Sequence, residues 1–368
     1  MAEQDPDVVV VGFGSAGATA ARLFARAGKR VLIIDKRPVG ETGARWVNSI
    51  PRWCFDAAGV TQPTGDELFG GYASGDDHVF HLVAPGGESR LALKAPPVLH
   101  VDMRRLVDRL ARQALEAGAV FLQASVREVG VVAERVSSVL VETREGTKRF
   151  RAKLIVDASG IGGAVRKRIP ALAGAWPAAE AESRCMAAQF QFAVRDKAAL
   201  EAFLRSHGAL PGHDVAFPGC AGGYSTLTLF TTRSLDQVGV LTGSIPALGV
   251  MDAGALLDQF AARAPWLGER LWGGRGAIPV RRPYDELACT GVALIGDAAC
   301  QVHASHGSGV GMGLLAARAL VDAVGHQADP GTSTTLEVYT RSFHRSYGGL
   351  LTAADAFRRF IQQASRAD

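Results

Sequence analysis

The sequence lacks a hydrophobic run long enough to cross a membrane. Hydrophobic residues make up 48% of the chain, yet no stretch approaches the roughly 18 consecutive apolar residues of a spanning helix. The first seven residues are acidic and lead directly into an apolar run, which leaves no room for a signal peptide. We therefore expect a cytoplasmic protein without an integral membrane segment.

Cysteine and excess charge are also scarce. The five cysteines form no CxxC pair, and their odd number argues against a disulfide framework and for reduced thiols. The net charge is only +4 over 368 residues, which argues against a nucleic-acid partner. The length itself suggests two domains.

What the sequence does contain is a dinucleotide fingerprint in its first 35 residues. An apolar β-branched strand at Val8–Val11 runs into Gly12-Phe13-Gly14-Ser15-Ala16-Gly17, and a helix over 18–27 follows. A second strand over 30–34 ends at Asp35. This order predicts a Rossmann-like βαβ unit.

Each position in the fingerprint has a physical reason. Gly12 permits a sharp turn out of the strand, Gly14 allows the backbone to approach a pyrophosphate, and Gly17 allows close packing of helix on sheet. The N-terminus of the following helix offers free N–H groups to the phosphates. Asp35 stands at the usual offset for an acid that binds an adenosine ribose. Alone, the unit indicates NAD or FAD.

Two later segments repeat the pattern of a buried strand followed by a glycine-rich loop. The strand 154–157 ends at Asp157 and leads to Gly160, and the strand 291–295 leads to Gly296 and Asp297. Between them, 185–242 alternates polar and apolar residues, as antiparallel strands do. The nucleotide domain is therefore predicted to be discontinuous, with a second domain inserted into it.

These three motifs together resemble the FAD-dependent oxidoreductases of the p-hydroxybenzoate hydroxylase fold, which include aromatic hydroxylases, flavin-dependent halogenases and geranylgeranyl reductases. The resemblance implies an α/β FAD-binding domain with an inserted antiparallel β-sheet (α+β) substrate domain. The implied boundaries are 1–50, 98–170 and 284–330 for the FAD-binding domain, 51–97 and 171–283 for the substrate-binding domain, and 331–368 for a C-terminal helical segment.

The resemblance also implies which residues hold FAD. Asp297 contacts the ribityl and phosphate region in that superfamily, and the glycine turn with the helix after it meets the flavin pyrimidine edge. The expected cofactor residues are Gly12, Gly14, Ser15, Ala16, Gly17, Asp35, Lys36, Arg104, Asp157, Gly160, Gly296, Asp297, Gly307, Gly309 and Val310. Because free N–H groups at a helix N-terminus favour negative charge, the turn suits a reduced flavin.

Three reactions stay open. Lys36-Arg37-Pro38 and Ile278-Pro279-Val280 are similar to the geranylgeranyl-reductase branch, but Trp46 stands where that branch carries a cysteine. We therefore expect a monooxygenase that acts on a small or medium aromatic substrate through a flavin C4a-hydroperoxide. The alternatives are an alkene reductase similar to geranylgeranyl reductases and a flavoprotein that oxygenates a tryptophan of a partner protein. NAD(P)H or a reductase would donate electrons, and O₂ would serve the oxygenases.

Catalytic candidates are His303 and His306, in the loop expected to face the flavin, because a histidine can act as acid or base near neutral pH. No acidic or cysteine cluster accompanies them, so no metal site is expected. Candidates for the substrate cleft are Arg45, Trp46, His213, Phe217 and Tyr224.

Overall fold

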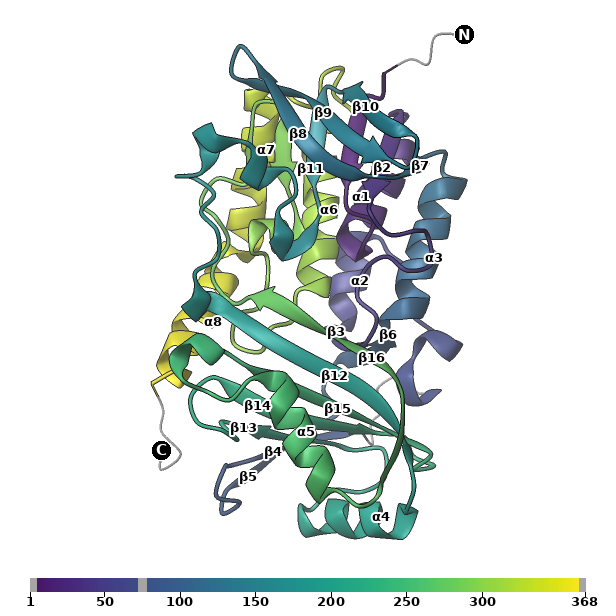
Figure 1. Cartoon of the computed structure of the whole chain (residues 1–368), viewed down its shortest axis with the longest axis vertical. Coiled ribbons are helices and arrows are strands. Elements are labelled where there is room, and N and C mark those ends of the chain that lie inside the picture. Colours follow the sequence, from purple (N-terminus) through teal and green to yellow (C-terminus); the bar gives the residue numbers. More distant parts are fainter. Residues whose placement is uncertain (1–4, 72–77, 364–368) are drawn as a thin grey trace.

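The computed structural model describes residues 5–71 and 78–363, and these form two stacked halves (Figure 1). In the half drawn uppermost, a six-stranded sheet has the order β17-β18-β11-β1-β2-β7. Its strands are β1 (Val8–Val11), β2 (Val31–Asp35), β7 (Val120–Gln123), β11 (Leu154–Asp157), β17 (Ala288–Cys289) and β18 (Val292–Leu294). All pair in parallel except β17 with β18, so the predicted Rossmann-like sheet is present.

Helices and a small sheet bury this sheet. Helix α1 (Ser15–Arg26) packs between α3 (Met103–Glu116) and α6 (Val310–Val324). A three-stranded sheet of β8 (Ser125–Val132), β9 (Arg135–Thr143) and β10 (Gly146–Arg151) adds valines to the same core. The sequence predicts these two helices over 18–27 and over 314 to about 324, whereas α1 begins at residue 15 and α6 at residue 310.

The early start of α6 has a packing reason. A Cβ on Gly311 would lie 2.7 Å from the Cys54 sulfur, and one on Gly313 would lie 3.1 Å from the Ala16 side chain. These glycines weaken local helix propensity, but they let α6 approach α1 and its other neighbours closely. Tertiary packing therefore outweighs propensity here.

The lower half is built on a seven-stranded sheet in the order β16-β12-β15-β14-β13-β4-β5. The strands are β4 (Val79–Val83), β5 (Arg90–Lys94), β12 (Arg184–Val194), β13 (Asp214–Pro218), β14 (Ser225–Thr231), β15 (Gln237–Ser244) and β16 (Leu267–Pro279). Helices α4 (Lys197–Ser206) and α5 (Ala253–Arg263) pack their leucines against it. Strands were expected over 72–93, of which 72–77 lie outside the described residues.

A two-stranded ribbon of β3 (Val47–Pro51) and β6 (Val98–Asp102) lies between the halves. Helix α2 (Arg52–Ala58), which follows β3, buries Cys54 and Phe55 in the core of the upper half. This helix lies within the segment 51–97 that was predicted to belong to the substrate-binding domain, and its buried side chains pack in the core around the six-stranded sheet.

The C-terminal segment is helical, as expected, and completes the upper core. Helix α7 (Ser333–Phe343) continues through a π-helical turn at His344–Gly348 into α8 (Gly349–Ile361). Shorter 3-10 turns lie at Gly65–Glu67, Phe69–Gly71, Gly160–Gly162, Arg166–Arg168, Pro170–Leu172, Ala181–Ser183, Pro246–Leu248 and Gly296–Ala299. All five cysteines are free thiols. Among the described helices, none has both the length and the apolar character that crossing a bilayer requires.

Candidate functional site

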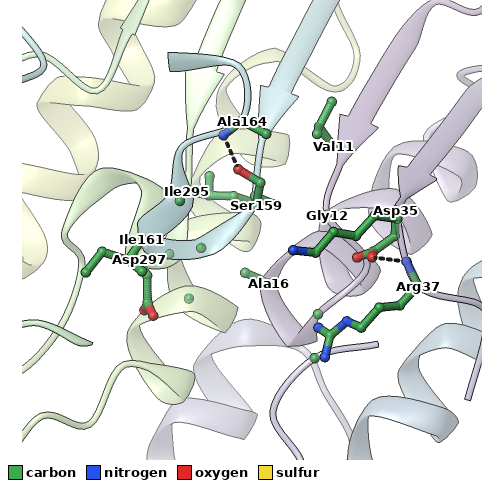
Figure 2. A pocket seen from close by; sticks show the side chains of 18 of the residues that line it. Val11, Gly12, Ala16, Asp35, Arg37, Ser159, Ile161, Ala164, Ile295 and Asp297 are labelled. Carbon is green, nitrogen blue, oxygen red and sulfur yellow. Dashed lines mark hydrogen bonds between the residues drawn. The ribbon is translucent and has the colours of Figure 1, made fainter. Parts of the chain in front are cut away.

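A cavity of about 620 Å³ opens beside the carboxyl ends of β1, β2 and β11 (Figure 2). In an open α/β sheet this edge is where ligands bind. Eleven of the fifteen predicted cofactor residues line the cavity. They are Gly12, Gly14, Ser15, Ala16, Asp35, Lys36, Gly160, Gly296, Asp297, Gly309 and Val310.

One end of the cavity is built for a phosphate group. Helix α1 begins at Ser15 with no side chain capping its first N–H groups, and such groups attract anions. A Cβ on the preceding Gly14 would meet only the Gly43 Cα, at 3.5 Å. The missing side chain therefore leaves space that a pyrophosphate can occupy.

The other two glycines of the fingerprint, Gly12 and Gly17, are required for close backbone packing and not for space in the cavity. Gly12 has φ +105°, and a Cβ there would lie 2.3 Å from the Ala158 carbonyl oxygen. A Cβ on Gly17 would lie 2.0 Å from the Gly12 carbonyl oxygen. Gly17 thus lies behind the cavity wall, where it allows α1 to pack against the turn.

Asp35 lines the cavity with its carboxylate fixed by two backbone donors. The N–H of Phe13 donates to Oδ2 over 2.8 Å. The N–H of Arg37 donates to Oδ1 over 2.9 Å (Figure 2). Each carboxylate oxygen can accept a further hydrogen bond. This geometry suits an acid that binds the hydroxyl groups of a ribose.

Asp297 lines the cavity from the loop after β18. A Cβ on Gly309 would lie 2.8 Å from Asp297 Oδ1, so the carboxylate lies beside the start of α6. Burial raises the pKa of Asp297 to about 6. A carboxylate in such surroundings gains from a ligand that donates hydrogen bonds to it.

The four remaining cofactor candidates lie outside the lining. Besides Gly17, these include Asp157, which is fully buried and accepts the N–H groups of Val165 and Arg166. Arg104 forms a paired hydrogen bond with Asp102, and its guanidinium lies 3.4 Å from the Trp272 ring centre. Gly307 has φ +74° and lies near Ile278 at the turn before α6.

The loop that carries the catalytic candidates folds back on itself. The rings of His303 and His306 stack with centroids 4.3 Å apart, and Ser305 Oγ lies 2.9 Å from His303 Nδ1. The His306 residue is exposed at the surface of this loop, with the ring of His303 against its own. Loss of hydration, with the neighbouring His303, lowers the pKa of His306 to about 4. Burial lowers the pKa of His303 as well.

Of the five cleft candidates, Trp46 lines the cavity. Tyr224 is buried near the Gly307 turn and donates its hydroxyl to the Ala304 carbonyl oxygen over 2.9 Å. Arg45 donates to the Gly40 carbonyl oxygen within its own loop.

The other two cleft candidates lie elsewhere. His213 Nδ1 is 3.0 Å from His81 Nε2 near the start of β13. Phe217 packs edge-on against His207, with the cluster of side chains beneath α4 and α5. The structure therefore does not bring His213 and Phe217 to the cavity.

Several residues that line the cavity were not predicted from the sequence. Gly43 and Arg37 lie in the loop after β2, and Ile278 lies near the end of β16. The remaining basic side chains are Arg127, Lys167 and Arg168. Ile278 and Arg37 each stood in a segment similar to the reductase branch, whereas Arg127, Lys167 and Arg168 carry no motif that marks them.

The cavity thus combines an uncapped helix start, a space left by Gly14 and two carboxylates that face a ligand. These features fit the pyrophosphate, ribose and ribityl groups of FAD. A sequence model of the family described as "FAD dependent oxidoreductase" matches residues 7–218. The chain belongs to this family. The flavoprotein therefore uses FAD as its cofactor, as the sequence predicted.

Known relatives of this FAD-dependent oxidoreductase include reductases. Digeranylgeranylglycerophospholipid reductase 1 of Methanopyrus kandleri is 30% identical over 322 residues, which cover 85% of this chain and 78% of the relative. Reductase 2 of the same organism is 27% identical over 350 residues, covering 93% and 83%.

Solved structures share the fold. A geranylgeranyl bacteriochlorophyll reductase-like protein from Thermoplasma acidophilum superposes with a TM-score of 0.81 at 17% identity, over 98% of this chain and 89% of that one. A flavin-dependent brominase superposes with a TM-score of 0.69 at 18% identity, over 98% and 88%. The predicted superfamily and the predicted two-part α/β architecture are confirmed.

Proposed function

We propose that this flavoprotein reduces carbon–carbon double bonds of an isoprenoid lipid. The observation that carries the proposal is the 30% identity to an archaeal digeranylgeranylglycerophospholipid reductase over 85% of the chain. Coverage of this extent takes in the substrate sheet as well as the FAD-binding segments. The relatives thus favour the reductase alternative over the aromatic monooxygenase that the sequence analysis preferred.

The wall that the substrate half contributes to the cavity supports an apolar substrate. Trp46, Ala277 and Ile278 line this side, and none of them carries a titratable group. Behind Ile278, a buried cluster contains Val280, Ile245 and Tyr224, whose hydroxyl is directed to a backbone carbonyl. Such a wall binds hydrocarbon and excludes water.

The residues that would hold FAD are those of the cavity: Gly14 and the first turn of α1 for the pyrophosphate, Asp35 for the adenosine ribose and Asp297 for the ribityl chain. Reduced FAD, when bound there, supplies a hydride to an alkene. The chain's own contribution is to orient the double bond against Trp46 and Ile278 and to keep water away. His306 is neutral at pH 7 because its pKa is lowered, so it is suited to accept or donate a hydrogen bond without charge.

The electron donor is also part of the proposal. A single dinucleotide fingerprint is present in the sequence, and FAD occupies it. NAD(P)H that binds transiently, or a separate reductase, would therefore reduce the flavin.

The test is anaerobic turnover of the FAD-loaded protein. The protein is reduced with dithionite and mixed with a lipid that carries geranylgeranyl chains, while flavin absorbance and lipid mass are recorded. We expect flavin reoxidation with gain of two hydrogens per double bond, and no reoxidation with the saturated lipid. Flavin that remains reduced without O₂, but reoxidises with substrate-stimulated O₂ consumption and an oxygenated aromatic product, would instead support the monooxygenase.

A further inference from the structure

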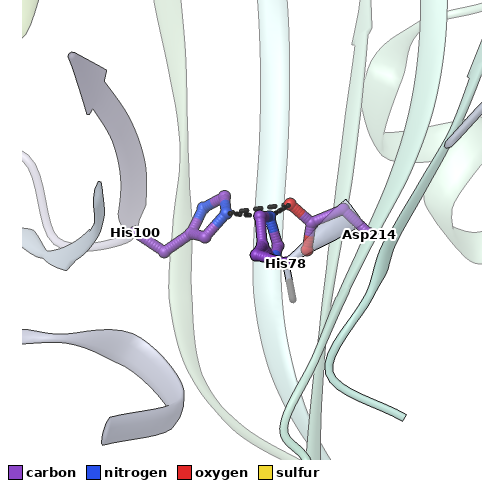
Figure 3. A group of neighbouring side chains, drawn as sticks. All are labelled: His78, His100 and Asp214. Carbon is purple, nitrogen blue, oxygen red and sulfur yellow. Dashed lines mark hydrogen bonds and ion pairs between the residues drawn. The ribbon is translucent and has the colours of Figure 1, made fainter. Parts of the chain in front are cut away.

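Away from the FAD cavity, three buried side chains from distant parts of the sequence meet at one point (Figure 3). His78 lies immediately before β4, His100 lies in β6, and Asp214 is the first residue of β13. Strands β4 and β13 pair in parallel, which brings His78 to Asp214, and the β3–β6 ribbon brings in His100. The exposed fractions are 2%, 7% and 2% respectively.

The three ligand atoms have the spacing of a metal coordination shell. His78 Nε2 is 3.3 Å from Asp214 Oδ2, His100 Nε2 is 2.8 Å from the same oxygen, and the two Nε2 atoms are 3.4 Å apart. In tetrahedral zinc sites with bonds of about 2.0–2.1 Å, neighbouring ligand atoms lie about 3.3 Å apart. Two of the three distances match this spacing closely, and the third, 2.8 Å between His100 Nε2 and Asp214 Oδ2, must lengthen by about half an ångström.

The opposite ring nitrogen of each histidine has a partner that orients it. The Gly212 carbonyl oxygen lies 3.2 Å from His78 Nδ1, and Ser49 Oγ lies 2.9 Å from His100 Nδ1. Histidines that bind metals commonly donate their second N–H to such groups. These contacts turn both Nε2 atoms toward Asp214.

Proton positions favour a cation between the three groups. Because a carbonyl oxygen only accepts, the contact with Gly212 places a proton on His78 Nδ1. In a neutral ring, His78 Nε2 then presents its lone pair to the Asp214 carboxylate. Two lone pairs that face each other in a buried site repel, and a metal ion between them removes that repulsion.

The Asp214 carboxylate and the two imidazole rings offer three ligand atoms that all lie within 4.8 Å of one another. A buried carboxylate and two imidazole nitrogens are a donor set that zinc accepts.

We propose that His78, His100 and Asp214 bind a divalent transition-metal ion of the zinc class. The ion joins the starts of β4 and β13 in the seven-stranded sheet to the β3–β6 ribbon, which begins directly after Trp46. Its role is structural, since it fixes the ribbon that connects the two halves. No metal site was expected from the sequence, because the three ligands lie at positions 78, 100 and 214 without local spacing.

The site also lies close to the loop that carries His303 and His306. The Ser308 hydroxyl donates to the Ser49 carbonyl oxygen over 3.4 Å, and Ser49 is the residue whose hydroxyl contacts His100. Loss of the metal is therefore expected to loosen the contact between the ribbon and this loop.

The test uses the full-length, FAD-loaded protein and Zn²⁺ alone. The protein is stripped with a chelator, equilibrated with Zn²⁺ by dialysis and analysed for metal by mass spectrometry. We expect one Zn²⁺ per chain in the wild type and less than a tenth of that in Asp214→Asn and His100→Gln. His81→Gln is the matched control, because His81 is a buried histidine nearby that lies outside the three-residue set, and it should retain the metal.

A second set of measurements uses only the wild-type protein, so it tests metal binding even if the variants do not fold. Co²⁺ added to the stripped wild type should produce the strong visible absorption of four-coordinate cobalt, at wavelengths beyond the flavin bands. Zn²⁺ at about 100 times its Kd should raise the Tm by roughly 3–5 °C. Wild-type protein that takes up no more Zn²⁺ than Asp214→Asn, or that gives a weak octahedral Co²⁺ spectrum, would overturn the proposal.

Discussion

The indole of Trp46 lies directly against Gly276. A Cβ on Gly276 would lie 2.6 Å from Cη2 of the Trp46 ring, which is too close for any side chain. The two residues are brought together by the docking of the loop after β2 on strand β16, and the Val47 N–H donates to Gln189 Oε1 beside them over 2.9 Å. Gly276 therefore sets the position of a side chain that lines the FAD cavity.

We expect Gly276→Ala to displace Trp46 and to reduce turnover, because the added methyl group occupies the place of the ring. Overpacking of this kind costs about 1–3 kcal/mol of stability. Gly274→Ala is the matched control, since a Cβ there would lie 3.4 Å from the same ring, at ordinary contact distance. Trp fluorescence and kcat/KM of the two variants would measure the difference, and equal effects would contradict this role of Gly276.

Gly14→Val should abolish FAD retention and leave the fold intact. The first atom of the new side chain has room, because its nearest neighbour is the Gly43 Cα at 3.5 Å, but the branches occupy the space meant for the pyrophosphate. Visible absorbance of the purified protein reports the loss, and circular dichroism reports the fold. Gly174→Val, on an exposed turn, should remain yellow. A yellow Gly14→Val protein would refute the assignment.

Asp297→Asn should stabilise the protein without FAD at neutral pH and weaken FAD binding. Burial raises the pKa of Asp297 from 3.8 to about 6, so the folded state holds a proton that the unfolded chain releases. This carboxyl group therefore destabilises the fold progressively as pH rises from about 4 to about 6. Because Asp297 is partly exposed, we expect a gain of about 1–2 kcal/mol at pH 7.

The measurement for Asp297 is thermal unfolding of deflavinated protein across pH 4–7. The difference in Tm between Asp297→Asn and the wild type should grow through this range. Parallel curves would show that the carboxyl group is not destabilised by burial.

His306→Gln should change stability with the opposite pH dependence. The pKa of His306 is lowered from 6.5 to about 4, so below pH 6.5 the unfolded chain takes up a proton that the folded ring refuses. The wild type should therefore lose stability relative to His306→Gln as pH falls from about 6.5 to about 4. The same Tm series measures this effect, and an unchanged difference between the two proteins would argue against a neutral His306.

The pH profile of turnover gives an independent check on His306. A histidine that is neutral near pH 7 is not an imidazolium acid there, so its titration should not shape the pH profile of turnover. We expect wild type and His306→Gln to share the shape of their kcat/KM profiles between pH 6 and pH 8. An inflection near pH 6.5 that disappears only in the variant would restore the acid–base role that the sequence suggested.

Many strands and helices could be predicted from the sequence because runs of apolar residues and glycine turns are local patterns. Strand β11 has the predicted bounds of 154–157, and β18 falls within the predicted 291–295. The helix starts at Ser15 and Val310 were missed because glycines lower local propensity, whereas packing against neighbouring elements decides those ends. The burial of Cys54 and Phe55 of α2 in the core of the six-stranded sheet left no local signal, since only contacts with distant residues create it.

The sequence alone predicted the FAD cofactor. Gly12, Gly14 and Asp35 indicate a dinucleotide through backbone conformation and short-range geometry within the first 35 residues, and the later motifs at Asp157 and Asp297 indicated FAD. Tertiary structure decided that Gly14 faces the cavity whereas Gly17 does not, that Trp46 lies on Gly276, and that His78 meets Asp214. These relationships depend on contacts between residues more than a hundred positions apart, or on which side of a turn packs against a neighbour. Pairing of strands and packing of cores create them, and neither leaves a local pattern in the sequence.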